Sequence, residues 1–60
     1  MKIKRFSHLH RDFDECLDYI NEYIELHRIK KEDILKFDYE LVKDAVNGRF
    51  WKIHLFYCYE

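Results

Sequence analysis

The second half of the chain alternates apolar and polar side chains, and this pattern constrains the fold more than any other feature. The alternation runs through residues 34–59 and is interrupted at Asn47-Gly48. A period of two is typical of half-buried strands, and Asn-Gly is a strong hairpin signal. The pattern therefore predicts a β-hairpin whose first strand is half-buried. The apolar row of that strand is Leu35, Phe37, Tyr39 and Leu41.

Two hairpin registers suit this turn. A two-residue turn at Asn47-Gly48 pairs Val46 with Arg49. A three-residue loop over 46–48, with its glycine in the left-handed conformation, pairs Ala45 with Arg49 instead. A slip of one residue moves every side chain of a strand to the other face, so the apolar pattern favours the three-residue loop. That register pairs Leu41 with Ile53, Tyr39 with Leu55, and Phe37 with Tyr57.

Residues 13–27 carry the spacing of an amphipathic helix. Their apolar residues recur at i, i+3, i+4 and i+7, which places them on one face. Asp12 is suited to the N-cap, and Glu15 stands three residues later, as in a capping box. Basic residues suit a helix C-terminus, so the helix is predicted to end between Leu26 and Lys31. The apolar stripe is Phe13, Cys16, Leu17, Ile20, Tyr23, Ile24 and His27.

The arrangement of these elements follows from how apolar each one is. A short basic segment, residues 2–6, predicts a first strand at a sheet edge. The last strand is apolar on both faces, whereas the strand before the turn is apolar on one face only. The last strand is therefore expected at the centre. The sequence predicts one small domain over residues 1–60, with an α+β fold of the order β-α-β-β. Its three-stranded sheet has the order 2-3-1, with one helix packed on one face.

Charge and cysteine content narrow the classes of function. Eleven basic and twelve acidic residues leave the chain near neutrality, without a general attraction to nucleic acid. No stretch approaches the roughly 18 apolar residues of a membrane span, and no apolar signal region follows the basic N-terminus. Two cysteines are fewer than a secreted scaffold of this size carries. We expect a cytoplasmic protein without a membrane segment.

The chain offers few groups for catalysis or metal binding. His8 and His10 stand at strand spacing, but no third ligand follows at a recognised distance. Cys16 lies on the buried helix stripe, where a thiol is normally inert. The single serine, Ser7, stands outside any nucleophile motif. We therefore expect a protein that is not an enzyme and uses no cofactor and no metal.

One helix covers only one face of a sheet, so the other face is expected to be exposed and partly apolar. Apolar patches on small proteins mark association surfaces, so this face is predicted to form a homodimer or to dock on a larger protein. The alternatives are that Phe56 turns inward through a bulge, or that the N-terminal segment covers the C-terminal end. The predicted interface is Val42, Phe50, His54, Phe56 and Cys58. A second candidate surface is the acidic side of the helix, with Asp14, Asp18, Glu22 and Glu25.

Several short motifs resemble a known family. The chain carries His-Arg-Asp-Phe before an acidic helix, Ile20-Asn21 within it, and a final aromatic strand ending near Tyr57. With the strand motif at 34–39, this order is similar to small sporulation-associated proteins of Bacillus and their phage-borne relatives. The similarity spans nearly the whole chain, although the hairpin here is shorter than in that pattern. The resemblance implies no catalytic residues.

These features indicate a small non-enzymatic protein that binds other proteins. We expect a regulator or inhibitor of a larger host protein, encoded by a phage or a Bacillus-like bacterium. The alternative is a small RNA- or DNA-binding module that uses the basic N-terminus and exposed sheet aromatics. The outer face also carries Asp38 and Glu40, which repel phosphate, so nucleic acid is the less favoured partner.

Overall fold

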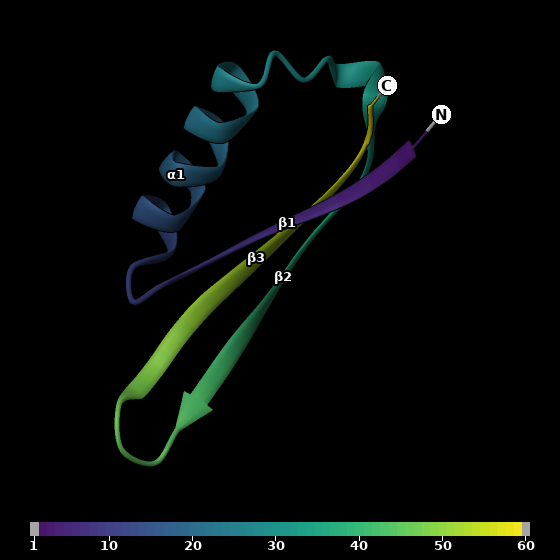
Figure 1. Ribbon diagram of the computed structural model, residues 1–60. Helices are drawn as coiled ribbons and strands as arrows, with labels where there is room; N and C mark the ends of the chain where they lie inside the picture. The colour runs from purple at the N-terminus through teal and green to yellow at the C-terminus, as the bar shows by residue number, and fades with distance from the viewer. Residues whose placement is uncertain (1, 60) are drawn as a thin grey trace.

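The chain folds into one helix and a three-stranded antiparallel sheet (Figure 1). This computed structural model describes residues 2–59. The elements are β1 (Lys2–His10), α1 (Phe13–Leu26), the 3-10 helix η1 (Lys31–Asp33), β2 (Ile34–Asp44) and β3 (Gly48–Tyr59). The strand order is β1-β3-β2, and β3 is antiparallel to both neighbours. The predicted α+β fold, with its central last strand, is confirmed.

Strand β1 is longer than the basic segment that predicts it. It extends from Lys2, opposite Tyr59, to His10, opposite Trp51. The pattern over residues 2–6 reveals only the start, because the rest of the strand forms through its ladder with β3. His8 and His10 therefore lie on a paired strand, and both point to the side of α1.

Asp12 caps α1 as predicted, but the predicted capping box with Glu15 does not form. The Asp12 carboxylate accepts a hydrogen bond from the Asp14 N–H at 2.9 Å, which confirms Asp12 as the N-cap. In a capping box Glu15 would accept from the Asp12 N–H, but here the acceptor is His10. Its Nδ1 accepts from the Asp12 N–H at 3.0 Å, and its Nε2 lies 3.0 Å from Oε2 of Glu15. The helix ends at Leu26, within the predicted interval.

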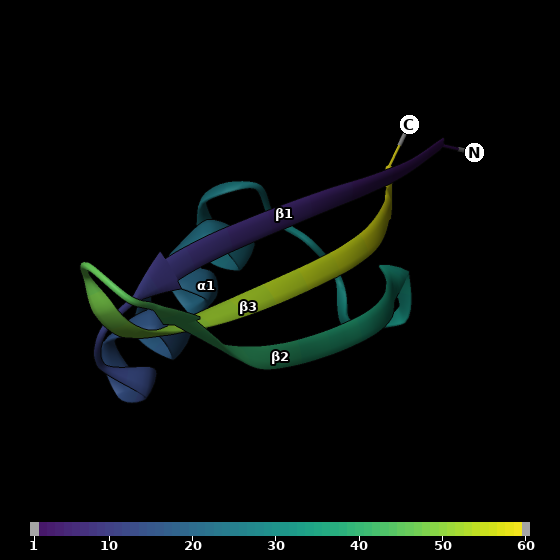
Figure 2. The same cartoon turned by 90° about the horizontal axis from the view of Figure 1, so that it is seen from below.

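The core lies between α1 and strands β1 and β3. Figure 2 shows α1 behind β1 and β3, with β2 at the far edge of the sheet. Stacking of Phe6 on Tyr23, with ring centroids 3.7 Å apart, attaches the helix to β1. Phe6 is one of the half-buried apolar residues that surround the core. The fully enclosed apolar residues are Cys16, Ile20, Ile53, Leu55 and Tyr57.

The prediction that β2 is half-buried is wrong. Its apolar side chains Phe37, Tyr39 and Leu41 are 45%, 58% and 39% exposed. A helix with side chains is about 10–12 Å wide, and neighbouring strands lie about 4.8 Å apart, so one helix covers about two strands. Only residues 11 and 12 link β1 to α1, which holds the helix over β1 and β3.

Both predicted hairpin registers are wrong. Asp44 pairs with Gly48, so the three-residue loop is 45–47 and not 46–48. The Asp44 carboxylate accepts from the Val46 N–H at 2.7 Å and the Asn47 N–H at 3.2 Å, and these bonds lower the pKa of Asp44. Gly48 has φ +89°, the left-handed conformation that was expected of it. The register differs by two residues from the favoured one, so the side chains of residues 36–44 keep their predicted faces.

A β-bulge at Leu35 changes which residue of β2 reaches the core. Ile34 pairs with Tyr57 and Lys36 pairs with Phe56, which leaves Leu35 as the extra residue. Ile34 packs against the core, while Leu35 is 54% exposed. Leu35 therefore does not occupy the buried position that its place in the alternation predicts.

Candidate interaction surfaces

The first candidate surface is the exposed apolar row of β2, which consists of Phe37, Tyr39 and Leu41. These residues pair with Leu55, Ile53 and Trp51 of β3, so they stand on the same side of the sheet as the core. Leu35 adds a fourth exposed apolar side chain at the bulge. Adjacent exposed side chains of this size on one strand form a continuous apolar patch, which is typical of an association site.

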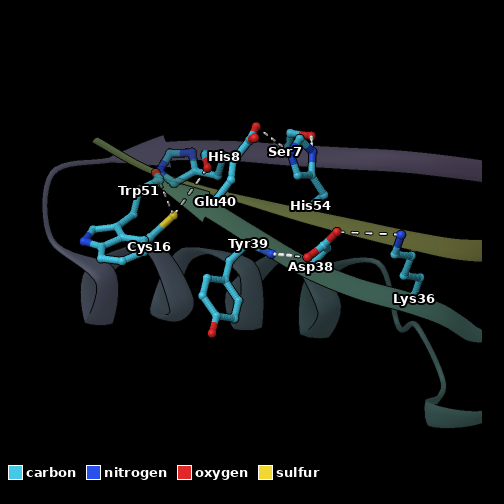
Figure 3. Close-up of polar contacts among 9 residues, drawn as sticks. All are labelled: Ser7, His8, Cys16, Lys36, Asp38, Tyr39, Glu40, Trp51 and His54. Atoms are coloured by element: carbon cyan, nitrogen blue, oxygen red, sulfur yellow. Dashed lines mark hydrogen bonds and ion pairs between the residues drawn. The ribbon is translucent and has the colours of Figure 1, made fainter. Parts of the chain in front are cut away.

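An aromatic cluster of Phe13, Tyr39 and Trp51 packs this row against the start of α1. The Phe13 ring lies 5.4 Å from the Tyr39 ring and 5.1 Å from the Trp51 ring, measured between centroids, and both contacts are edge-on. Edge-to-face pairs at this separation are favourable. Figure 3 shows Tyr39 on the α1 side of the sheet. Beyond this cluster lies a shallow concavity lined by Arg11, Leu41, Arg49 and Trp51.

The second surface is the outer face of the sheet, opposite α1. The register places all five predicted interface residues there, and all five are half-buried. Phe56 stays on the outer face, because the bulge lies in β2. Strand β1 adds Ile3 and Leu9, which are 65% and 47% exposed and which the sequence analysis missed. The five predicted residues are Val42, Phe50, His54, Phe56 and Cys58.

Cations cover the two aromatic rings of this outer face. The Arg11 guanidinium lies 5.0 Å from the Phe50 ring centroid, and the Lys36 ammonium lies 6.0 Å from that of Phe56. Both distances fall within the range of cation–π attraction. The two aromatic rings of the outer face are therefore partly covered by charged side chains.

A polar relay crosses the outer face with one residue from each strand (Figure 3). Ser7 Oγ lies 2.7 Å from His54 Nδ1, and His54 Nε2 lies 3.3 Å from Glu40 Oε1. Hydroxyl, imidazole and carboxylate stand in the order of a nucleophile set, but such sets also need oxyanion donors in an enclosed site. This relay lies on an open sheet face. We infer that it orients the three side chains and joins the strands.

The acidic residues of α1 form a third surface. Asp14, Asp18, Glu22 and Glu25 are all exposed, as the helix period predicts. Within residues 2–59, none of the four lies within ion-pair distance of a basic group. Their negative charge is therefore open to solvent along the side of α1 that faces away from the sheet.

The Cys16 thiol and the His8 imidazole, which were considered for catalysis and metal binding, are held in place by contacts with neighbouring residues. Cys16 Sγ is fully buried and donates to the His8 carbonyl at 3.3 Å, and burial raises the pKa of this thiol. The His8 ring stacks on Tyr19 at 3.7 Å, and burial, with a smaller effect of His10, lowers the pKa of His8. Across residues 2–59, no three His, Cys, Asp or Glu side chains converge on a metal position.

No protein-family model, curated protein or solved structure matches the chain. The resemblance to sporulation-associated proteins therefore stays a prediction. In the part of the chain that the structure describes, no helix combines the length and the apolar character needed to cross a membrane. The surfaces described above are the basis for a functional proposal.

Proposed function

We propose that this chain is a small non-enzymatic protein-binding protein, a regulator or inhibitor that acts through the apolar row of β2. The observation that carries the proposal is the exposure of Phe37, Tyr39 and Leu41 beside a core that α1 covers only over β1 and β3. Burying an exposed side chain of this size contributes about 1 kcal/mol or more. A partner that covers the row therefore completes the apolar layer.

The proposal places the chain in the cytoplasm, where its two cysteines stay reduced. The outer face and the acidic side of α1 remain available for further contacts. Of the two, the outer face ranks behind the apolar row, because Arg11 and Lys36 cover its aromatic rings.

Replacement of Phe37 by lysine tests this proposal. We expect Phe37→Lys to weaken association at least tenfold, because a charge enters the middle of the apolar row. Association is followed by light scattering on a sizing column over a dilution series, and by capture of partner proteins on the immobilised chain. Leu26→Lys is the matched control, since Leu26 is 80% exposed at the end of α1, away from the row.

Phe37→Lys and Phe56→Glu together show which face of the sheet is the interface. If Phe37→Lys binds as the unaltered chain does, the row is not the interface. If Phe56→Glu abolishes association instead, the outer face is the interface. The circular dichroism of α1 must remain unchanged in each variant for the comparison to hold.

A second candidate function is binding of single-stranded nucleic acid at the concavity beside Trp51. Two arginines, Arg11 and Arg49, line it together with this aromatic ring, and among residues 2–59 no acidic side chain lines it. Arginine contacts phosphate and an aromatic ring stacks on a base, which is how single strands are bound without sequence preference.

Trp51 is the only tryptophan, so its fluorescence reports on this site alone. If nucleic acid binds there, we expect an oligothymidine to quench the fluorescence at low salt. Quenching then weakens steeply with added salt and is lost in Arg49→Glu, because phosphate contacts depend on counterion release. Unchanged fluorescence at low salt removes this candidate.

A further inference from the structure

We propose that a second copy of this chain occupies the free edge of β2, joined by antiparallel β2–β2 pairing centred on Asp38. This inference rests on the proposed function, since it names the partner that contacts the apolar row. It adds a defined register and a two-fold symmetric dimer with a continuous six-stranded sheet.

Strand β2 is suited to such pairing. Within residues 2–59 it is an eleven-residue strand that pairs on one side only, with β3. An unpaired strand edge of this length is a template for another strand. The other edge strand, β1, carries Lys2, Lys4 and Arg5 without an acidic residue, so two β1 edges repel each other.

The charges of β2 select the register. When Asp38 lies on the two-fold axis, Lys36 of each copy faces the partner's Glu40, which gives two opposite-charge pairs. Directly opposed residues of antiparallel strands lie close together, and opposite charges there are favourable. Lys36 and Glu40 both lie on the outer face and are exposed, so both are accessible to the second copy, although Lys36 also contacts Asp38 and Glu40 also contacts His54.

The same register matches the apolar side chains. Phe37 faces the partner's Tyr39 on the side of α1, and this pair occurs twice. Leu41 reaches the level of the partner's Leu35, at the bulge. Aromatic pairs across strands are favourable, so the two apolar rows contact each other side by side along the new seam.

Other registers are less favourable. Centring the axis on Tyr39 sets Asp38 opposite the partner's Glu40 twice. Centring it on Glu40 opposes two glutamates and sets Phe37 opposite the partner's Lys43. Lys36 then faces the partner's Asp44, but that carboxylate already accepts the Val46 and Asn47 N–H groups of its loop. Centring it on Phe37 leaves only residues 36–38 in a regular ladder, because the bulge begins at Leu35.

The axis brings two Asp38 side chains together, and pairing also requires the Tyr39 N–H, which the Asp38 carboxylate accepts at 2.9 Å, to turn to the second copy. Lys36 lies 3.6 Å from Asp38 in the same chain and supplies a compensating charge. The contact between identical surfaces is isologous, so assembly closes at two copies and does not continue into a filament.

Charge exchange between Lys36 and Glu40 tests the register. Lys36→Glu and Glu40→Lys, each alone, oppose like charges twice and are expected to weaken the dimer at least tenfold at low ionic strength. An equimolar mixture of the two variants restores opposite charges at both pairs and is expected to form a heterodimer at about the strength of the unaltered chain. The double variant in one chain is expected to recover in the same way. Association is measured by light scattering over a dilution series at low salt, because added salt screens exposed pairs.

Controls and outcomes keep this inference separate from the proposed function. Arg28→Glu makes the same charge change as Lys36→Glu on an exposed residue outside β2 and outside the candidate surfaces, and it is expected to leave association unchanged. A dimer that is insensitive to the exchange, or that the mixture does not restore, overturns the register. If the chain is monomeric at all concentrations, the proposal that a second copy occupies the β2 edge is wrong. Binding of another protein that is lost in Phe37→Lys would still support the proposed function.

Discussion

Replacement of Leu55 by alanine is expected to lower the free energy of unfolding by about 3 kcal/mol, within the range of buried leucine truncations. Leu55 is fully buried on the central strand, between Phe6 of β1 and Phe37 of β2, and the helix covers it. A single core in a domain of this size rarely supplies more than about 3–5 kcal/mol in total. We therefore expect Leu55→Ala to be largely unfolded at 37 °C.

Leu35→Ala is the matched control, because the residue type is the same and the side chain is 54% exposed at the bulge. Its expected loss is below about 1 kcal/mol. Urea unfolding is followed by the circular dichroism of α1, at a dilution where the chain is monomeric. Equal losses in the two variants would contradict the position of α1 over β1 and β3.

Alkaline pH is expected to destabilise the fold through Tyr57. Its side chain is 5% exposed, and its hydroxyl lies 2.7 Å from that of Tyr23. Burial, assisted by this hydrogen bond, raises the pKa of Tyr57 from 10.0 to about 12. The folded state holds the proton more tightly than the unfolded state, so the stabilisation is complete below pH 10 and is lost as the pH rises through 12.

Tyr57→Phe isolates this contribution. One pKa unit corresponds to about 1.4 kcal/mol. The free energy of unfolding of the unaltered chain is therefore expected to fall by up to about 2–3 kcal/mol between pH 10 and pH 12. Urea unfolding at pH values between about 9 and 12 should show a smaller decline in Tyr57→Phe, because only the unaltered chain carries the shifted group. Tyr39→Phe, at a position 58% exposed, should decline as the unaltered chain does. Equal declines in Tyr57→Phe and the unaltered chain would contradict the assignment.

The elements that depend on local signals are predictable from the sequence. The period of α1, the N-cap at Asp12 and the left-handed Gly48 all follow from residues within a few positions of each other. The central place of β3 also follows, because only that strand is apolar on both faces. The outer-face position of Phe56 and His54 is also predictable, because alternation along a strand determines which side chains share a face.

The hairpin register was not predictable from the alternation alone. A shift of two residues keeps every side chain on its face, so the apolar pattern does not distinguish such registers. The carboxylate of Asp44 decides between them by accepting two N–H groups of the loop. Aspartate at the first position of a turn is a known local signal, and it could have identified this loop.

The sequence alone is sufficient to predict the helix, the hairpin, the order of the strands, and the faces shared by residues 36–44 and by β3. It does not predict the extension of β1 to His10 or the bulge at Leu35. Tertiary structure alone decided which part of the inner face is covered. Alternation shows that Phe37, Tyr39 and Leu41 face the side of α1, but coverage depends on the width of a single helix and on the short link at residues 11 and 12. Because one helix covers about two strands, the third strand keeps its apolar row exposed, and that exposure is the basis of the proposed function.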